Sequence, residues 1–394
     1  MRLKENPQIH LTYCLNVHSG ESWQENFDAI KQNTLAIRDK IAKGKAFGLG
    51  LRLGFEAASQ LIKMEELERF SQFLQEEGLY VFTINGFPYG QFHNTSVKED
   101  VYRPDWQSSQ RRDYTMMLAD ILARLLPEGV NGSISTLPLS YKKWITNEQQ
   151  TQQMVRMLSD VAVHLNAIFE KSGKNICIGL EPEPDCLIEN TDELLEFFSK
   201  PLINTGVEYI ERNYALENAE EILKRHIGIC FDTAHLAVEF EDLAKSYRKI
   251  KAASIQICKV QLSVALEMKK TTQALGQLND FSDSVYLHQV KIQTKEGVIF
   301  SYADMPKAIE DAVPGRWRIH FHVPLFFTNN RDLGSTFSCL DANFFRELLK
   351  GYTPHLEIET YTFDVLPDFL RNKGVIESIT KEYQWVLLQL EPKG

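Results

Sequence analysis

Two histidines lie close together in an apolar segment near the C-terminal end of the chain. Residues 318–326 read RIHFHVPLF, which places His320 and His322 two positions apart in a run typical of a β-strand. Alternate side chains of a strand point to the same side, so both imidazoles should leave one face together. Neutral imidazole is a common ligand of divalent metals. The pair therefore predicts contact with a metal or a substrate, unless both rings are hydrogen-bonded parts of a core.

Carboxylates also follow apolar segments at spacings that suit metal binding. In FDTAH, Asp232 and His235 come just after an apolar run, so one turn could supply two ligands. Glu181 and Glu183 lie in EPEPD, where either carboxylate could instead cap the following turn. In LEIETY, strand alternation puts Glu357 and Glu359 on one face. Glu359 is nearer the C-terminal end of that strand and is the better ligand candidate.

The elements that must position these residues alternate between strand and helix along almost the whole chain. This rhythm predicts a parallel sheet covered by helices, and with so many units an eight-stranded α/β barrel, the TIM (β/α)8 fold, is the leading architecture. The strand candidates are residues 9–17, 47–54, 79–86, 130–140, 175–185, 226–235, 252–263, 318–326 and 354–363. These are nine candidates for eight places, so one should be an addition to the barrel. A hairpin is predicted over 286–302, around Lys295, Glu296 and Gly297.

We therefore predict a single barrel domain over residues 1–394, with an insertion at approximately 264–326. The active site of such a barrel lies where the strands end and the following loops begin. Polar residues at these ends, or in the loop after the third strand, are candidates to bind a substrate. They are His18, Arg52, Asn85, His93, Glu183, Lys259, Gln261 and Glu357.

Asp, Glu and His converging on one mouth of a barrel would make a site for a divalent cation such as Mn, Zn, Mg or Co. Without a cation, several carboxylates close together in an apolar wall would raise one another's pKa values and take up protons. A bound cation resolves that repulsion and can acidify a water or a hydroxyl group.

Composition and net charge limit the kinds of molecule that this protein is expected to bind. The 394 residues are 43% hydrophobic and 24% charged, as in an ordinary globular protein, and the formal net charge is -10. This acidic balance works against nucleic acid as a partner, so a small-molecule substrate is expected. The N-terminal segment MRLKENPQIHLTY lacks the apolar run of a signal peptide or membrane anchor. We therefore expect a cytoplasmic protein without membrane insertion; the sequence predicts no oligomeric state.

The cysteines are scattered and form no Cys-x-x-Cys pair, and several fall inside predicted strands. This pattern indicates reduced core residues, and it favours neither a disulfide framework nor a thiolate metal site. The six cysteines are Cys14, Cys177, Cys186, Cys230, Cys258 and Cys339.

Several motifs together resemble a known superfamily. EPEPD, CFDTAH, KVQLS and the late LEIETYTF resemble the xylose isomerase-like barrels, which include sugar isomerases, epimerases and endonuclease IV-type enzymes. More narrowly, LTYCLNVHSGESW, NGFPYGQFH, VYRPDW, IHFHVPLF and LEIETYTFDVLP are similar to the metabolite-traffic protein EboE family, which is associated with export of metabolite precursors.

The superfamily resemblance implies a metal held by a Glu, an Asp, a His and a second Glu after successive strands. The first two correspond to Glu181 and Asp232, and the last corresponds to Glu359 or, less well, Glu357. His235 matches an additional histidine of the endonuclease-like branch. The third position departs from the pattern, because KVQLS carries Gln261 where a histidine is expected. Either the cation is held more loosely, or His320 or His322 supplies the missing imidazole.

Three functions follow from this set of residues. The first is a metal-dependent isomerase or epimerase of a small polyhydroxylated metabolite, in which Glu181 and Glu359 are ligands and also move the proton. The second is a metal-dependent phosphoesterase of the endonuclease type, acting on a small phosphate ester and favoured by the Asp232 and His235 spacing. The third is a non-catalytic binding or trafficking protein on the same barrel, which the change at Gln261 favours.

Overall fold

The protein folds around a closed barrel of parallel strands. The computed structural model describes residues 1–91, 98–281 and 286–391. In these residues, eight parallel strands lie in the order β2-β3-β4-β5-β6-β7-β8-β15, and a parallel bridge between Cys14 and Gly50 joins β2 to β3. The strands are β2 (Gln8–Tyr13), β3 (Phe47–Arg52), β4 (Leu79–Asn85), β5 (Gly132–Thr136), β6 (Ile176–Leu180), β7 (Ile227–Asp232), β8 (Ile257–Leu262) and β15 (His355–Ile358). A further strand, β1 (Arg2–Glu5), pairs antiparallel with β2.

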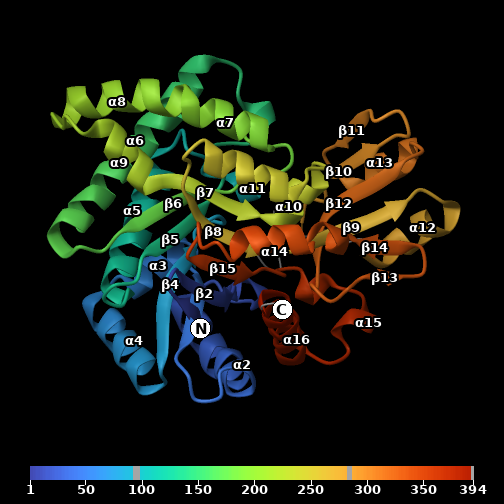
Figure 1. Cartoon of the computed structure of the whole chain (residues 1–394), viewed down its shortest axis with the longest axis horizontal. Coiled ribbons are helices and arrows are strands. Elements are labelled where there is room, and N and C mark those ends of the chain that lie inside the picture. Colours follow the sequence, from blue (N-terminus) through green and yellow to red (C-terminus); the bar gives the residue numbers. More distant parts are fainter. Residues whose placement is uncertain (92–97, 282–285, 392–394) are drawn as a thin grey trace.

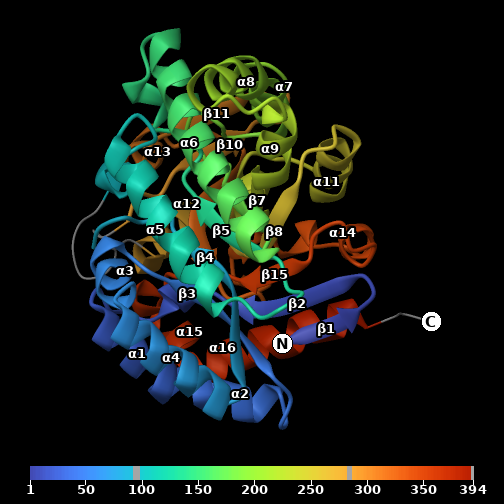
Figure 2. The ribbon, with the colours of Figure 1, turned by 90° about the vertical axis from the view of Figure 1, so that its left-hand side faces the viewer.

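Helices surround this barrel in the α/β pattern that the sequence predicts (Figures 1 and 2). The predicted barrel fold is thus confirmed. The helices are α1 (Trp23–Ala29), α2 (Leu35–Ile41), α3 (Phe55–Leu61), α4 (Met64–Glu76), α5 (Ser109–Leu125), α6 (Glu148–Ser172), α7 (Thr191–Ser199), α8 (Pro201–Tyr214), α9 (Ala219–His226), α10 (Thr233–Val238), α11 (Leu243–Ala252), α14 (Ala342–Leu348), α15 (Asp368–Arg371) and α16 (Val375–Leu390).

Local signals in the sequence set several helix ends. Ser22 and Glu25 form a capping box at the start of α1, in which each residue satisfies a backbone N–H of the other. The helix α6 ends at Gly173, whose φ of 71° is the left-handed conformation that glycine adopts without strain. These ends determine where each helix turns back toward the next strand of the barrel.

A second sheet, antiparallel and six-stranded, lies beside the barrel and is seen to its right in Figure 1. Its order is β11-β10-β12-β9-β14-β13, so the segment RIHFHVPLF belongs to this sheet and is the additional strand candidate. The predicted hairpin is confirmed as β10 and β11. The elements are β9 (Val264–Lys269), α12 (Thr272–Gln277), β10 (Val290–Gln293), β11 (Ile299–Tyr302), α13 (Met305–Asp311), β12 (Arg316–Val323), β13 (Asn329–Asn330) and β14 (Leu333–Ser335).

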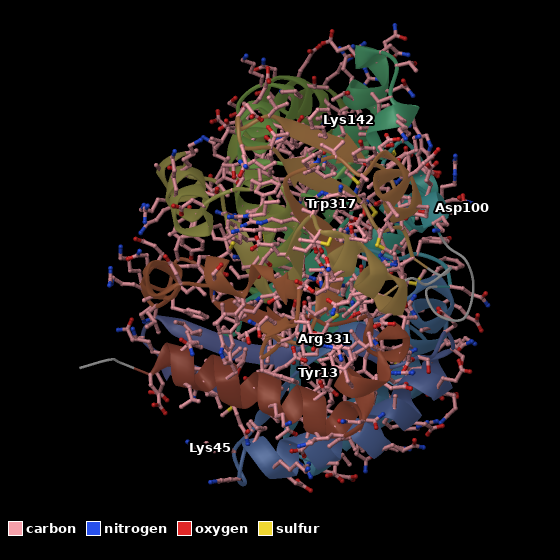
Figure 3. All side chains as sticks on the ribbon, turned by 90° about the vertical axis from the view of Figure 1, so that its right-hand side faces the viewer. Tyr13, Lys45, Asp100, Lys142, Trp317 and Arg331 are labelled. Atoms are coloured by element: carbon pink, nitrogen blue, oxygen red, sulfur yellow. A yellow bond between two sulfur atoms is a disulfide. The ribbon has the colours of Figure 1, made fainter. Side chains whose placement is uncertain are left out.

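The strand β12 is buried on both faces. Trp317, labelled in Figure 3, is fully buried and donates a hydrogen bond from Nε1 to the Val313 carbonyl at 2.9 Å. Phe321 packs edge to face with Phe281, with ring centroids 5.5 Å apart. This side of β12 is the core of the insertion, and its other side carries His320 and His322. The second sheet begins at Val264, as the predicted insertion does, and continues past residue 326 to Ser335; the single-domain organisation stays a prediction.

The expectation that every cysteine is reduced is wrong for one pair. Cys177 of β6 and Cys258 of β8 form a disulfide, with Cα atoms 5.8 Å apart. The strand β7 lies between β6 and β8, and its Gly228 has no side chain to occupy the space. A Cβ placed on Gly228 would lie 2.8 Å from the Cys258 sulfur. Periodicity predicts the strands that hold both cysteines, but it does not show that a glycine lets their sulfurs meet across a third strand.

No helix in the described ranges combines the length and the apolar character that crossing a membrane requires.

Candidate metal centre

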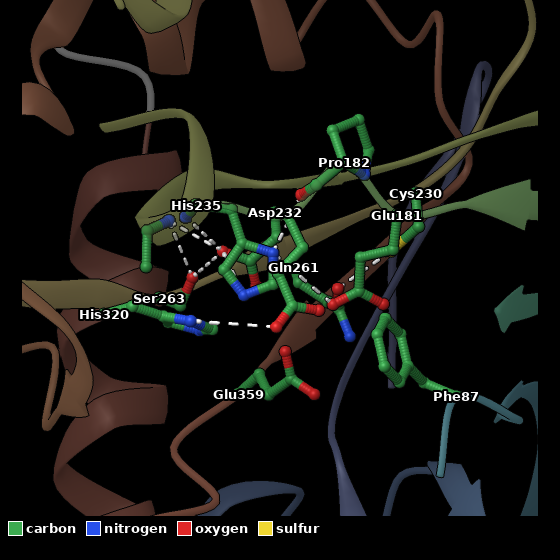
Figure 4. A network of polar contacts seen from close by, with 12 residues as sticks. Phe87, Glu181, Pro182, Cys230, Asp232, His235, Gln261, Ser263, His320 and Glu359 are labelled. Carbon is green, nitrogen blue, oxygen red and sulfur yellow. Dashed lines mark hydrogen bonds and ion pairs between the residues drawn. The ribbon is translucent and has the colours of Figure 1, made fainter. Parts of the chain in front are cut away.

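Six side chains from the barrel and the insertion meet at the carboxyl ends of the barrel strands. Figure 4 labels Glu181, Asp232, His235, His320 and Glu359 among them. Glu181 follows β6, Asp232 ends β7, and Glu359 follows β15. His235 comes from the first turn of α10, whereas His320 and His322 come from β12. None of the six is more than 4% exposed. The structure thus brings together all of the residues that the sequence proposes as metal ligands.

The ligand atoms form three overlapping sets. Each set brings three ligand atoms within 4.8 Å of one another, a separation that one cation can bridge. The sets are His235 with His320 and His322, Glu181 with Asp232 and His235, and Asp232 with His322 and Glu359. The shared direction predicted for the β12 pair is confirmed, since both rings lie against His235 at centroid distances of 4.5 and 5.4 Å.

Asp232 is held by the start of α10. Its Oδ1 accepts hydrogen bonds from the backbone N–H groups of Ala234 and His235, and from the Ser263 hydroxyl at 2.8 Å. It is therefore the N-cap of α10 as well as a member of the cluster. This arrangement fixes the carboxylate and leaves Oδ2 without a hydrogen-bond partner in the described chain.

Each imidazole is oriented through its Nδ1 atom. His235 Nδ1 lies 2.9 Å from the Pro182 carbonyl, and His322 Nδ1 lies 3.1 Å from the Glu359 carbonyl. A carbonyl oxygen only accepts, so Nδ1 carries the proton in both rings and Nε2 has the lone pair. His320 Nδ1 instead contacts the Gln289 Oε1 atom at 2.8 Å. Such outer contacts are the usual means of orienting a metal-binding histidine.

Two amides hold one carboxylate of the cluster. Glu359 Oε1 accepts hydrogen bonds from Asn16 Nδ2 at 2.8 Å and from Asn85 Nδ2 at 3.0 Å. Asn85 was predicted to contact a substrate, and the structure also gives it this positioning contact. Glu181 Oε2, in contrast, is buried and has no hydrogen-bond partner among the described residues.

The carboxyl groups of the cluster lie close together and are shielded from water, and both conditions shift their pKa values. Burial raises the pKa of Glu181 to about 8, and burial together with the neighbouring carboxylates raises the pKa of Glu359 well above its ordinary value. Burial would also raise the pKa of Asp232, but His235, His322 and its hydrogen bonds hold that pKa below the ordinary value. Burial lowers the pKa of His322 to about 4, so this ring is uncharged at neutral pH.

The donor atoms fit a divalent cation. Four buried atoms of the cluster lack a hydrogen-bond partner within the described part of the chain, namely Glu181 Oε2, Asp232 Oδ2, His320 Nε2 and His322 Nε2. Leaving a buried polar atom unsatisfied costs about 1–3 kcal/mol. Coordination of a cation by any of the three sets would satisfy some of these atoms. Carboxylate oxygen and imidazole nitrogen suit Zn, Mn, Co or Fe, so a divalent metal fits while its identity stays open.

Gln261 has a hydrogen-bond partner of its own inside the barrel. It lies on β8 and is fully buried, and its Oε1 accepts a hydrogen bond from the Cys230 thiol at 2.9 Å. The amide oxygen of Gln261 therefore already accepts a hydrogen bond within the barrel. Among the β12 histidines, His322 groups with Asp232 and Glu359.

Lys259 and Glu357 are paired within the barrel interior. Lys259 Nζ lies 2.5 Å from Glu357 Oε2, and both side chains are fully buried. Neither lines the open pocket beside the cluster, and Gln261 does not line it either. The sequence predicts that these three residues contact a substrate; the structure gives each of them a partner inside the barrel, and the substrate contact stays a prediction.

Two other predicted residues lie away from the cluster. Arg52 is buried at the end of β3, where it pairs with Glu21 at 2.9 Å and donates to the carbonyls of Gly20 and Gly90. His18 lies 2.9 Å from the Tyr13 hydroxyl and lines a separate surface pocket. His93, the remaining candidate, lies outside the described residues.

An open pocket leads to the cluster. Its lining includes Glu181, His235, His320 and Glu359. The outer wall contributes Asn85 and Glu183, both predicted from the sequence. It also contributes residues that sequence reasoning missed, namely Phe87, Lys98, Tyr102, Tyr286 and Tyr361.

Two of these pocket residues lie in sequence motifs named above. Phe87 lies in NGFPYGQFH and Tyr102 in VYRPDW, two of the motifs that carry the narrower resemblance. Neither motif predicts a role for its aromatic residue. Tyr102 donates a hydrogen bond to Glu183 Oε1 at 2.8 Å, a contact between residues 81 positions apart.

Comparisons with known proteins add only to the description of the fold. No protein-family model matches the chain, and no curated protein sequence matches it. Among solved structures, it is similar to an IolI protein with a bound zinc atom, at 13% identity and a TM-score of 0.49, covering 97% of this chain and 98% of that one.

Two solved xylose isomerase domain proteins are about as similar to this chain as the IolI protein is. The protein from Planctomyces limnophilus is 12% identical with a TM-score of 0.49, covering 97% of this chain and 95% of its own. The protein from Alicyclobacillus acidocaldarius is 11% identical with a TM-score of 0.47, covering 96% and 98%.

Proposed function

We propose that this chain is a divalent-metal-dependent isomerase or epimerase of a small polyhydroxylated metabolite. The observation that carries the proposal is the cluster of three overlapping sets of buried ligand groups at the carboxyl ends of the barrel strands, four of whose atoms have no hydrogen-bond partner among the described residues. Beside this cluster lies an open pocket that Glu181, His235, His320 and Glu359 help to line.

The proposed ligands come from both parts of the fold. Glu181, Asp232 and Glu359 would hold the cation from the barrel, and imidazoles of His235, His320 and His322 would complete its coordination. The β12 histidines would thereby compensate for Gln261. When bound, a divalent cation polarises a carbonyl or hydroxyl oxygen and stabilises negative charge that develops on it.

Proton transfer is assigned to Glu181 and Glu359. An isomerisation or epimerisation removes a proton from a carbon next to a carbonyl group and returns one to the substrate. Glu359 is held by two amides, so its carboxylate has a fixed position for this step. Glu183 and Asn85, which line the pocket, would bond hydroxyl groups, and the rings of Phe87 and Tyr286 would pack against the apolar faces of the substrate.

A phosphoesterase acting on a small phosphate ester is the second candidate. Six ligand groups in three overlapping sets are more than a tetrahedral cation requires, and such a surplus would suit a site with two cations. A non-catalytic binding protein on the same barrel is the remaining alternative. The similarity to the EboE family, with its link to export of metabolite precursors, stays a prediction.

The first test is metal content. We expect the purified protein to hold a stoichiometric divalent cation, and we expect added Zn or Mn to raise the melting temperature of protein stripped with a chelator. Asp232→Asn should weaken Zn binding by more than the roughly 10–100-fold typical of outer contacts, because it removes a direct ligand charge. Elemental analysis and titration with Zn measure both effects.

The matched control is Asp242→Asn. Asp242 caps α11 as Asp232 caps α10, but it lies outside the cluster. Its substitution should leave Zn binding unchanged. Protein that contains no metal, together with a melting temperature that Zn, Mn and Co all fail to raise, would refute both metalloenzyme functions and leave the binding protein.

If metal is bound, exchange of substrate hydrogen with solvent deuterium separates the two enzymes. Sugars, cyclitols and their phosphates would be incubated with the loaded protein in D₂O. Deuterium incorporated at carbon supports isomerisation or epimerisation, whereas release of inorganic phosphate without exchange supports the phosphoesterase.

A further inference from the structure

Gln289 connects the insertion to the wall of the pocket and to one histidine of the cluster. It lies just before β10 and is fully buried. Its side chain contacts three groups, namely His320 Nδ1 at 2.8 Å, the Tyr102 hydroxyl oxygen at 2.9 Å and the Pro184 carbonyl at 3.1 Å. Its own backbone carbonyl also accepts a hydrogen bond from the His320 N–H at 2.9 Å.

The Pro184 carbonyl determines which way the amide of Gln289 faces. A carbonyl oxygen can only accept a hydrogen bond, so the NH₂ group of Gln289 must point toward Pro184. The Tyr102 hydroxyl agrees with this orientation, because it donates its own proton to Glu183 and so accepts from Gln289. The amide oxygen of Gln289 is left facing His320.

The amide oxygen of Gln289 in turn determines which ring nitrogen of His320 carries the proton. An amide oxygen requires a donor, so Nδ1 of His320 is the protonated nitrogen and Nε2 has the lone pair. His320 Nε2 is one of the buried atoms without a hydrogen-bond partner in the described residues, and His320 belongs to one of the three ligand sets. Glu183 lies too far from the ring to replace Gln289, at 3.8 Å from Nδ1.

We propose that Gln289 is a positioning residue that holds His320 in the tautomer able to bind a metal through Nε2. His235 and His322 obtain the same tautomer from backbone carbonyls, which no substitution removes. His320 alone among the three depends on a side chain, and that side chain belongs to the insertion. The metal-binding consequence rests on the proposed function, whereas the tautomer itself is a property of the metal-free protein.

The test is the tautomer of His320 in metal-free protein, read from long-range proton–nitrogen NMR correlations at about pH 8, where imidazole is ordinarily neutral. We expect wild-type His320 to be protonated at Nδ1. Gln289→Leu removes the acceptor at similar side-chain volume and should move the proton wholly or partly to Nε2. Gln289→Glu keeps an acceptor oxygen and should retain the Nδ1 proton.

Gln293→Leu is the matched control, since Gln293 ends β10, opposite Arg316 and Ile299, outside the cluster. It should leave the His320 signals unchanged. A wild-type ring protonated at Nε2 overturns the proposal even if the Leu variant fails to fold, and so does a Leu variant that keeps its proton wholly at Nδ1.

Titration with Zn then reports the consequence. Gln289→Leu should weaken Zn binding by about 10–100-fold, the range expected for an outer contact of a ligand. A wild-type protein that shows the expected tautomer but binds no Zn contradicts the proposed function and leaves the assignment of Gln289 intact. Normal Zn binding in a Leu variant with a shifted proton would overturn the role of Gln289 in metal binding.

Discussion

At the residue scale, Lys259 and Glu357 form a buried ion pair in the barrel interior, near the candidate metal centre. Glu357, Glu181, Asp232 and Glu359 all influence titrating groups in the barrel interior, and Lys259 opposes the charge of Glu181 and Glu359. Space for the Glu357 carboxylate comes from β3, because a Cβ on Gly50 would lie within contact distance of Glu357 Oε1. The pair therefore depends on a glycine from a strand distant in sequence.

Breaking this pair should be costly. Lys259→Met leaves the Glu357 charge buried without its partner, and we expect a loss of about 3–5 kcal/mol in the free energy of unfolding. The double variant Lys259→Met with Glu357→Met removes both charges and should recover most of that loss. Urea denaturation of the wild type, both single variants and the double variant measures the coupling. A Lys259→Met protein as stable as the wild type would contradict the assignment.

At the element scale, the sequence predicted the strands well and their partners less well. Apolar runs followed by polar residues located β6, β7 and β15 together with Glu181, Asp232 and Glu359, because the period of a strand is visible in one segment. The apolar pattern of one segment does not show which sheet a strand joins, since β12 has the same pattern as a barrel strand. The contacts of Gln289 also escaped prediction, as they join segments that periodicity treats separately.

The helix α16 offers a pH-dependent test at this scale. Glu382 is fully buried, where it accepts hydrogen bonds from the Thr360 hydroxyl and the Leu325 N–H. Burial raises its pKa from the ordinary 4.5 to about 8. The folded chain therefore binds this proton more tightly than the unfolded chain does, so its contribution to stability is lost as pH rises from about 4.5 toward about 8.

Glu382→Gln should remove that contribution to the pH dependence. Glutamine retains an acceptor oxygen and carries no charge, so we expect a melting temperature a few degrees above that of the wild type at about pH 8. Near pH 4.5 the two proteins should melt at similar temperatures. Melting curves across this range check the prediction, and parallel pH profiles for both proteins would contradict it.

At the scale of the whole molecule, the candidate site is shared between two sheets. The barrel supplies the carboxylates and His235, and the insertion supplies His320, His322 and Gln289. Precise placement of the imidazoles therefore requires that the second sheet stay docked on the barrel mouth. A buried lysine on β10 makes this connection, since Lys291 Nζ pairs with Asp185, Glu189 and Glu239 at 3.2, 3.0 and 3.0 Å.

Lys291→Met should loosen the insertion without unfolding the barrel. It removes the cation that three carboxylates share, so those carboxylates would repel one another across the junction. We expect faster hydrogen exchange in β10 and β12 with little change in β3 to β5, and a weaker affinity for Zn. Lys307→Met is the matched control, because Lys307 pairs with Glu310 and Asp311 on the exposed surface of the same insertion. Exchange that rises equally in the barrel and the insertion would show that Lys291 stabilises the whole fold, and unchanged Zn binding would show that the imidazoles keep their places without it.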